Sequence, residues 1–294
     1  MAISTRLIRS RIKSVSNTKK ITKAMELVSA AKMRRAVSSA TSARRYASLG
    51  AELLRDLSAL GATIDHPFFR IAAKTDKVLM VVIGSDRGLC GGYNASLMRA
   101  VDAAAGKFSQ VDFVCVGRHV ELALRRAGRN IIASFSGLTN APRAAAIRPI
   151  VTLAESEFVS GIYDAVYIAS TNYISALRQT PDVKRLLPLD DRGEASISKL
   201  GDASPRLSSD ALFEPTPRDV LEYTLPRFIE ATAYQAVLEA AASEHSARMM
   251  SMRSASDAAG DMITDYTFTL NQARQSAITS EIAEISAGRA ALEG

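Results

Sequence analysis

The sequence predicts an α/β domain combined with a long antiparallel coiled coil. Both ends of the chain have helix-forming sequence, since residues 3–60 lack proline and the pattern after Pro217 stays helical almost to Gly288. Between them, short β-branched runs alternate with helical patterns, which is typical of a small domain with a largely parallel sheet. We expect the ends to form a rod. The expected parts are residues 1–60 (N-terminal helix), 75–205 (α/β domain) and 210–294 (C-terminal helix, paired with 1–60).

The N-terminal helix carries an apolar stripe with steps of four and three residues. The residues predicted to form this stripe are Ile8, Ile12, Val15, Ile21, Met25 and Val28. Cations fill the other faces of the helix, so the pattern indicates an amphipathic helix that packs along one side.

The C-terminal helix keeps the same four-three repeat for about six heptads. The repeat consists of Leu238, Ala242, His245, Met249, Met252, Ser256, Ala259, Ile263, Tyr266, Leu270, Ala273 and Ala277. A 3.5-residue repeat of this length predicts a left-handed coiled coil. Its small side chains bury little apolar area, so we expect other chains to surround the helix pair.

The two ends have opposite net charge. Residues 1–60 contain 13 Lys and Arg against 3 Asp and Glu, whereas residues 210–294 contain 6 against 13. This difference favours pairing between the ends. A locally basic face also suits an acidic protein, a nucleic acid backbone or an anionic membrane surface, and composition does not choose among these partners.

The middle region predicts strands and helices in alternation. The expected strands are Lys77–Ile83, Val111–Val116, Asn130–Ser134 and Ala165–Thr171, and the expected helices are Asn94–Ala105, Glu121–Arg126 and Pro149–Val159. Residues 181–217 hold five of the nine prolines, which predicts loop and linker.

The glycine-rich turn GSDRGLCGGYN at residues 84–94 lies between a predicted strand and a predicted helix, where phosphates often bind. Its spacing fits neither a Walker A sequence nor the dinucleotide fingerprint. The second strand ends in Gly117-Arg118-His119 and lacks the acid that would hold a ribose. We therefore predict no cofactor, and a structural turn or a partner-facing loop.

The other candidate groups favour structural roles. The three histidines and two cysteines lack metal-ligand spacing: His66, His119, His245, Cys90 and Cys115. We expect the cysteines to be buried and His245 to pack in the helix seam. We interpret the acids Asp190, Asp191 and Glu194 as solvated loop charges, and we expect no membrane span because no apolar run reaches 18 residues.

Three segments together resemble the gamma subunit of the F-type ATP synthase, its central stalk. They are KKITKAMELVSAAKMRRA (19–36), SDRGLCGGYN (85–94), and SEHSARMMSMRSASDAAGDMI with LNQARQSAITSEIAEISAGRAAL (243–263 and 270–292). The resemblance implies a non-catalytic rotor that transmits torque and binds no cofactor itself. The implied partners are the alpha and beta subunits, the epsilon subunit and the membrane ring of c subunits, with one copy of the chain per complex.

The resemblance also implies contact residues. Lys23, Met25, Lys32 and Arg35 would pass the acidic lever segment of the beta subunits, with Asp86, Arg87 and Cys90 near the same region, and Arg274, Gln275 and Thr279 would meet the catalytic subunits elsewhere in the ring. Two places depart from the family pattern: Gln272 replaces a basic residue, and Asp257-Ala258-Ala259 stands where an asparagine is common.

The N-terminal sequence runs into the helix without a cleavage-like break, so we expect mature structure here and a bacterial protein. The resemblance then implies a position on the cytoplasmic side of the inner membrane, with attachment only through the complex. The alternatives are a basic coiled-coil protein that binds nucleic acid and a nucleotide-dependent enzyme built on the middle domain.

Overall fold

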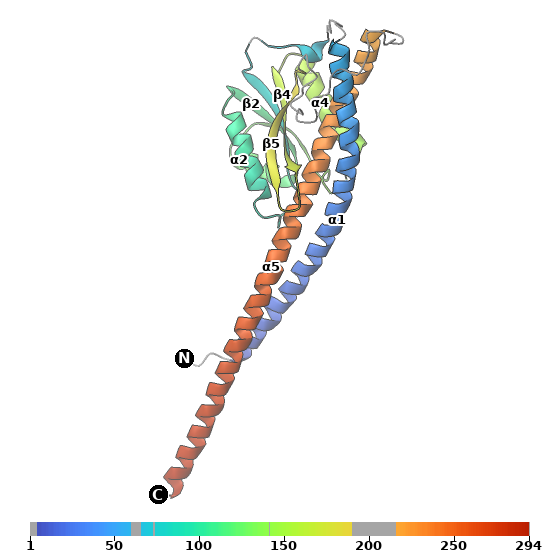
Figure 1. Cartoon of the computed structure of the whole chain (residues 1–294). Coiled ribbons are helices and arrows are strands. Elements are labelled where there is room, and N and C mark those ends of the chain that lie inside the picture. Colours follow the sequence, from blue (N-terminus) through green and yellow to red (C-terminus); the bar gives the residue numbers. More distant parts are fainter. Residues whose placement is uncertain (1–4, 60–65, 73, 141, 190–215, 294) are drawn as a thin grey trace. The chain divides into compact units, whose positions relative to one another are not determined.

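The computed structural model describes residues 5–59, 66–72, 74–140, 142–189 and 216–293. The first and the last elements of the chain are two long helices, α1 (Thr5–Ala59) and α5 (Pro217–Glu293) (Figure 1). The remaining elements are η1 (Pro67–Phe69), β1 (Lys77–Ile83), α2 (Tyr93–Ala105), β2 (Gln110–Val116), α3 (Arg118–Arg126), β3 (Ile131–Phe135), α4 (Ala144–Val159), β4 (Ala165–Tyr173) and β5 (Gln179–Leu187). The chain divides into two compact units, residues 29–248 and residues 1–28 with 249–294.

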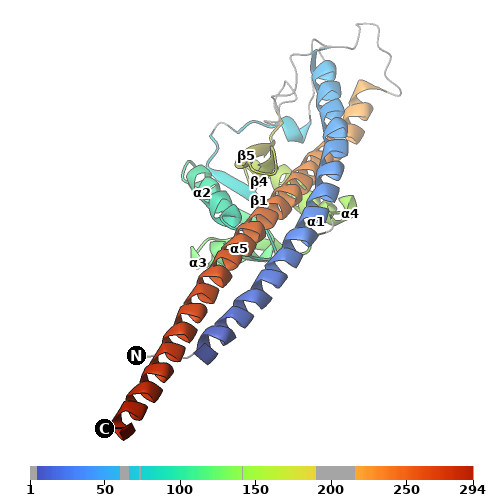
Figure 2. The same cartoon turned by 60° about the horizontal axis from the view of Figure 1, so that its bottom comes forward.

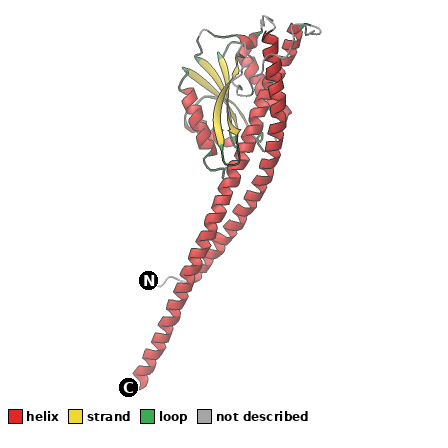
Figure 3. Ribbon diagram, in the orientation of Figure 1, coloured by secondary structure: helices red, strands yellow, loops and turns green. Residues whose placement is uncertain are grey.

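The sheet of the larger unit has the strand order β3-β2-β1-β4-β5. Strands β1 to β4 run parallel, and β5 pairs antiparallel with β4 at one edge (Figure 3). In the middle of the sheet, Val78 of β1 pairs with Val111 on one side and with Ala165 on the other. The predicted α/β fold with a largely parallel sheet is confirmed.

Both faces of the sheet are covered by helices, which explains why β1 is an uninterrupted apolar run. On one face, Met80, Val82 and Phe113 pack against α2 and α3 through Leu97 and Leu124. On the other face, side chains of β1, β2 and β4 pack against α4 and the first part of α5. The residues of this second layer include Leu79, Val81, Val114, Ile168, Ile147, Phe158, Leu225, Ile229 and Val237.

Within the larger unit, α1 and α5 lie side by side and run antiparallel (Figure 2). Ala36 and Ala242 share a buried cluster, and Arg44 pairs with Glu239 at 2.8 Å. Farther along α1, a Cβ at Gly50 would lie 3.0 Å from the ring of Phe228. Small residues therefore let the two helices approach closely.

The predicted seam of α5 is confirmed by its burial. Leu238, Ala242, His245, Met252, Ser256 and Ala259 are buried, and Met249, Ile263, Tyr266, Leu270 and Ala273 are half-buried. Charged neighbours such as Arg253 and Asp257 are exposed. The repeat breaks down at Ala277, which is exposed.

The predicted stripe of α1 is correct at its start and wrong farther along. Ile8 is buried, but Ile21 and Val28 are 60% and 57% exposed, and Thr22 and Ser29 are buried instead. Counting in steps of four and three from Ile8 leads to Thr22 and Ser29, whereas Ile21 and Val28 lie one residue, about 100° of helix rotation, away. The seam stays regular, and polar residues occupy it.

Two element predictions in the middle region also need correction. Strand β5 lies at 179–187, where we predicted a loop; Pro181 fits there because β5 is an edge strand, and an edge tolerates a missing backbone donor. Helix α4 begins at Ala144 and contains Pro149, which we took as its start. Asp190, Asp191 and Glu194 lie outside the described residues.

Candidate partner-contact site

The glycine-rich turn after β1 packs closely against the turn after β2. A Cβ at Gly84 would lie 2.1 Å from Val120 Cγ2, and a Cβ at Gly117 would lie 2.6 Å from the Gly84 carbonyl oxygen. Gly117 also has φ +105°, which side chains rarely adopt. Both glycines are therefore needed for packing between the two turns.

Side chains fix the two ends of this loop. The Asp86 carboxylate accepts hydrogen bonds from the backbone N–H groups of Arg118 and Gly137, at 3.3 and 2.7 Å. Asn94 donates to Ser85 Oγ at 2.7 Å and to Cys90 Sγ at 3.5 Å. Of the three predicted contact residues here, Asp86 and Cys90 thus stabilise the loop.

The middle of the loop faces outward. The Arg87 side chain is exposed, and Leu89 is 59% exposed with φ +62°, in the left-handed region. Cys90 is buried, and burial raises the pKa of its thiol. Arg87, a predicted contact residue, and Leu89, which the sequence analysis did not name, are therefore exposed side chains of this loop.

Two buried charged residues of α5 contact the inner side of the loop. The guanidinium of Arg248 donates to the carbonyl oxygens of Arg87 and Gly88, and it pairs with Glu244 at 2.7 Å. The sequence analysis did not single out Arg248 or Glu244. The available signal was an acid and a base at positions i and i+4 beside the seam residue His245.

Two predicted contact residues of α1 line one cavity of the larger unit. The cavity has a volume of about 270 Å³, and Lys32, Arg35 and Arg143 bring three cations to it. Lys32 Nζ donates to Asn140 Oδ1 at 2.6 Å. Burial, and then Arg248 and Lys32, lower the pKa of the lining His245 to about 4, so this histidine is neutral at pH 7. The side chains that line the cavity include three cations and no acid, a combination that attracts carboxylates.

The smaller unit contains the other predicted contact residues. On α1, Lys23 pairs with Glu26 at 2.9 Å and Met25 is half-buried. On α5, Arg274, Gln275 and Thr279 are exposed, and Thr279 Oγ1 donates to the Gln275 carbonyl oxygen at 2.9 Å. Exposed apolar side chains accompany them on both helices: Leu7, Ile21, Leu27, Val28, Met262, Phe268, Ile278, Ile282 and Ile285.

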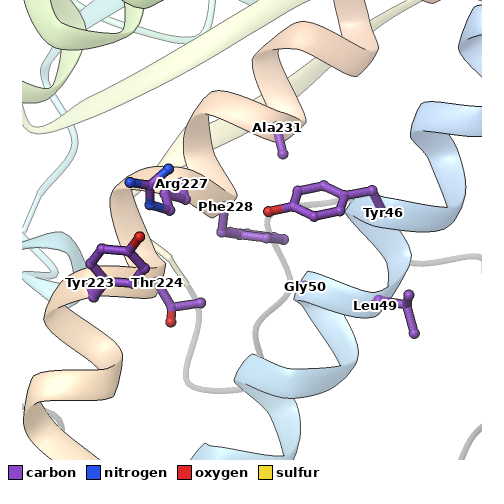
Figure 4. Close-up of a pocket in the computed structure, with 8 residues that line it drawn as sticks. All are labelled: Tyr46, Leu49, Gly50, Tyr223, Thr224, Arg227, Phe228 and Ala231. Carbon is purple, nitrogen blue, oxygen red and sulfur yellow. The ribbon is translucent and has the colours of Figure 1, made fainter. Parts of the chain in front are cut away.

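A second cavity, of about 280 Å³, opens between α1 and α5 of the larger unit (Figure 4). Its lining consists of Tyr46, Leu49, Gly50, Tyr223, Thr224, Arg227, Phe228 and Ala231. Aromatic and aliphatic side chains dominate it, and Arg227 stacks over the Tyr223 ring at 4.5 Å. Such a lining suits an apolar partner better than a phosphate.

Within the described part of the chain, no group of three His, Cys, Asp or Glu residues could hold a metal ion. No helix there has the length and apolar character needed to cross a membrane. Both cysteines are free and buried, as predicted.

The paired helices expose both cations and apolar side chains, and side-chain hydrogen bonds fix the loop at residues 85–90. These features are typical of one class of protein, a helical assembly subunit that acts through contacts with partner chains. A family model described as ATP synthase matches residues 4–292. The chain belongs to this family, and its curated relatives are ATP synthase gamma chains.

One relative, the gamma chain of Herpetosiphon aurantiacus, is 40% identical over 98% of this chain and 99% of its own. Another, from Azoarcus sp., is 40% identical over 97% and 98%. The Euglena gracilis mitochondrial ATP synthase has a chain with a TM-score of 0.69 at 17% identity, covering 98% of this chain and 94% of that one. A central-stalk structure from Tetrahymena thermophila gives 0.61 at 23%, covering 80% and 99%.

These matches confirm the predicted family, since the relatives are ATP synthase gamma chains, and the solved structures confirm the fold. They give no support to a nucleic-acid-binding protein. The individual contact residues remain predictions, and the next subsection develops them.

Proposed function

We propose that this chain transmits torque between a membrane ring of c subunits and the catalytic beta subunits of a proton-translocating ATP synthase. The observation that carries the proposal is its similarity to gamma chains along nearly the whole length, at 40% identity. The helix pair has the character that this role needs, because its small-residue seam buries little area and its outer faces carry exposed apolar side chains.

The proposed surroundings follow from the distribution of these faces. Alpha and beta subunits would enclose residues 1–28 and 249–294, where exposed apolar side chains lie beside exposed cations. The epsilon subunit and the c ring would contact the middle domain, for which we keep the boundaries 75–205. We propose one copy per complex, held at the cytoplasmic side of a bacterial inner membrane through the other subunits.

We propose that the cations of α1 bind an acidic segment of the beta subunits. Lys23, Lys32 and Arg35 carry this contact, and the cavity beside Lys32 would receive a carboxylate between three cations. Met25 is half-buried, so the exposed part of its side chain would add apolar contact area. Charge here selects the partner and its orientation more than it adds affinity, because exposed ion pairs are individually weak.

Two further groups complete the proposed interface. Arg87 and its braced loop, including Asp86 and Cys90, would meet the same region of the beta subunits. Arg274, Gln275 and Thr279 would contact the catalytic subunits along the last part of α5, where all three are exposed. Rotation of such unlike faces past each beta subunit in turn would change its affinity for nucleotide.

Reconstitution tests the proposal. The full chain is mixed with alpha and beta subunits, and ATP hydrolysis and complex formation are measured. We expect a stable complex and a rise in hydrolysis over the mixture without the chain. A mixture with neither a complex nor a rise in hydrolysis would contradict the proposed function.

A paired variant tests the acidic contact. Changing Lys32→Glu with Arg35→Glu should weaken the complex and make its affinity less sensitive to salt, because attraction to carboxylates becomes repulsion. Arg34→Glu with Arg45→Glu is the matched control, since both residues are exposed on the same helix and neither lines the cavity. Equal losses for the two pairs would show that net charge alone matters.

A further inference from the structure

We infer that Arg248 is a positioning residue that, with Glu244, fastens the partner-contact loop at residues 85–90 to helix α5. The inference rests on the proposed function, because it assigns a task to a loop that we propose to meet the beta subunits. It concerns a side chain that touches the loop backbone and lies inside the protein.

The Arg248 side chain donates hydrogen bonds to two consecutive peptide groups. Its Nη2 donates to the Arg87 carbonyl oxygen at 2.8 Å, and its Nε donates to the Gly88 carbonyl oxygen at 3.1 Å. Arg248 is only 6% exposed, so these bonds compete little with water. A planar guanidinium can serve two carbonyls and a carboxylate together, which the ammonium of lysine does less well.

The charge of Arg248 is compensated inside α5. Glu244, one helical turn earlier and 3% exposed, accepts from Nη2 at 2.7 Å. Burial raises the pKa of Glu244, and the charge of Arg248 acts against that rise. His245 Nδ1 lies 3.3 Å from Nη1 and completes the buried group. Such a pair is costly to break on one side, because the remaining charge stays buried and unpaired.

The loop needs this support in its middle. Asp86 and Asn94 fix its two ends, but Leu89 between them points outward and has a left-handed φ of +62°. The segment that exposes Arg87 and Leu89 receives two hydrogen bonds from Arg248, and Cys90 Sγ adds a weaker one to the Arg87 carbonyl oxygen at 3.9 Å. Because Arg248 belongs to a long helix, a force on the loop passes directly to that helix.

Neighbouring residues of α5 fasten other parts of the domain in the same way. Ser243 Oγ donates to the Thr171 carbonyl oxygen at 3.0 Å, and Ser246 Oγ donates to the Ala176 carbonyl oxygen at 2.8 Å. Residues 243–248 thus bind backbone carbonyls of strand β4, of the turn that follows it and of the loop at residues 85–90. Arg248 differs from the serines in carrying a charge, and its loop is the one proposed to contact a partner.

The native cysteines report on the fastening in the free full-length chain. Cys90 belongs to the loop and is buried, whereas Cys115 lies in the core of the sheet. In Arg248→Met, we expect maleimide to label Cys90 about tenfold faster or more, because local opening controls access to a buried thiol, while Cys115 keeps its wild-type rate. Arg253→Met is the matched control, since Arg253 is exposed on the same helix.

Two more variants keep the test decisive. Arg248→Lys should fall between wild type and Arg248→Met, because lysine restores the charge without the fork. Should Arg248→Met fail to fold by circular dichroism, Glu244→Gln removes the compensating charge at nearly constant shape and should raise Cys90 labelling in the same direction. Unchanged Cys90 labelling in a folded variant overturns the inference.

The reconstituted complex shows whether the position of the loop matters for function. We expect Arg248→Met to lower the maximal rate of ATP hydrolysis at an unchanged KM for ATP, with partial rescue in Arg248→Lys. Faster Cys90 labelling with wild-type hydrolysis would overturn the positioning role. If wild-type chain fails to stimulate hydrolysis at all, the proposed function fails, and the labelling result still decides whether Arg248 holds the loop.

Discussion

At the scale of single residues, one carboxylate oxygen of α4 is buried without a hydrogen bond. Glu155 Oε1 is buried and has no partner within the described residues. Burial, and then the negative charge of Glu230, raise the pKa of Glu155 to about 7. Arg148 pairs with Glu230 at 3.2 Å, so this cation compensates the neighbouring acid.

This raised pKa gives Glu155 a defined effect on stability. Between pH 4.5 and about 7 the folded chain holds a proton that the unfolded chain releases, so the contribution of Glu155 to stability falls as pH rises through this range. Glu155→Gln should remove that fall. Urea unfolding near the two ends of the range measures it as a difference between variant and wild type.

The comparison of variant with wild type is needed because His245 changes the stability with pH in the opposite direction. Its pKa is lowered to about 4, so its contribution is present above pH 6.5 and is lost as pH falls toward 4. Glu157→Gln, two residues along the same helix, controls for loss of a negative charge. An identical pH profile for Glu155→Gln and wild type would contradict the assignment.

At the scale of elements, glycines in the two long helices have different neighbours. A Cβ at Gly260 would lie 2.8 Å from Lys19 Nζ, the far end of a flexible side chain that can move away. A Cβ at Gly50 would lie 3.0 Å from the ring of Phe228, which is buried and held by the core. The same substitution should therefore have opposite effects at the two positions.

We predict that Gly260→Ala stabilises the chain by roughly 0.5–1 kcal/mol, since alanine reduces the entropy lost when the helix forms. Gly50→Ala should lower stability, because the gain in helix propensity is opposed by the displaced ring. Both values come from urea unfolding of the full chain. Destabilisation by Gly260→Ala would show that Lys19 cannot move freely.

At the scale of the whole molecule, the chain leaves apolar side chains exposed while polar residues occupy part of its seam. Ile21 and Val28 lie outside the seam of α1, and Thr22 and Ser29 lie within it. Contiguous exposed apolar surface commonly marks an interaction site. This arrangement agrees with a chain whose outer surface is covered only in its complex.

Replacing Ile21 and Val28 together by serine tests this interpretation. The stability of the free chain should change little, within about 0.5 kcal/mol per site, because both side chains are exposed. The affinity for alpha and beta subunits should fall, measured by titration of the chain into the other subunits. Ile8→Ser, at a buried position, should instead destabilise the free chain. Unaltered affinity in the double variant would place the interface elsewhere.

The sequence predicted those features whose cause is local. The repeat of α5 was correct because small residues recur at regular steps from Leu238 to Ala273. The stripe of α1 failed because apolar residues were taken as the seam, where Thr22 and Ser29 are buried. Strand β5 was missed because proline and charges are tolerated at an edge. Arg248 was missed because its partners are backbone carbonyls 160 and 161 residues away, which leave no trace in the sequence.

The apolar residues on the outside of α1 also bear on the life of the chain before assembly. A subunit that leaves Ile21, Leu27 and Val28 in water completes its hydrophobic burial only when other chains arrive. The last step of apolar burial is therefore bimolecular. The concentration of partner chains sets how long these apolar side chains stay exposed to water. Under the proposed function, synthesis of such a chain has to be matched in time to that of its partner subunits.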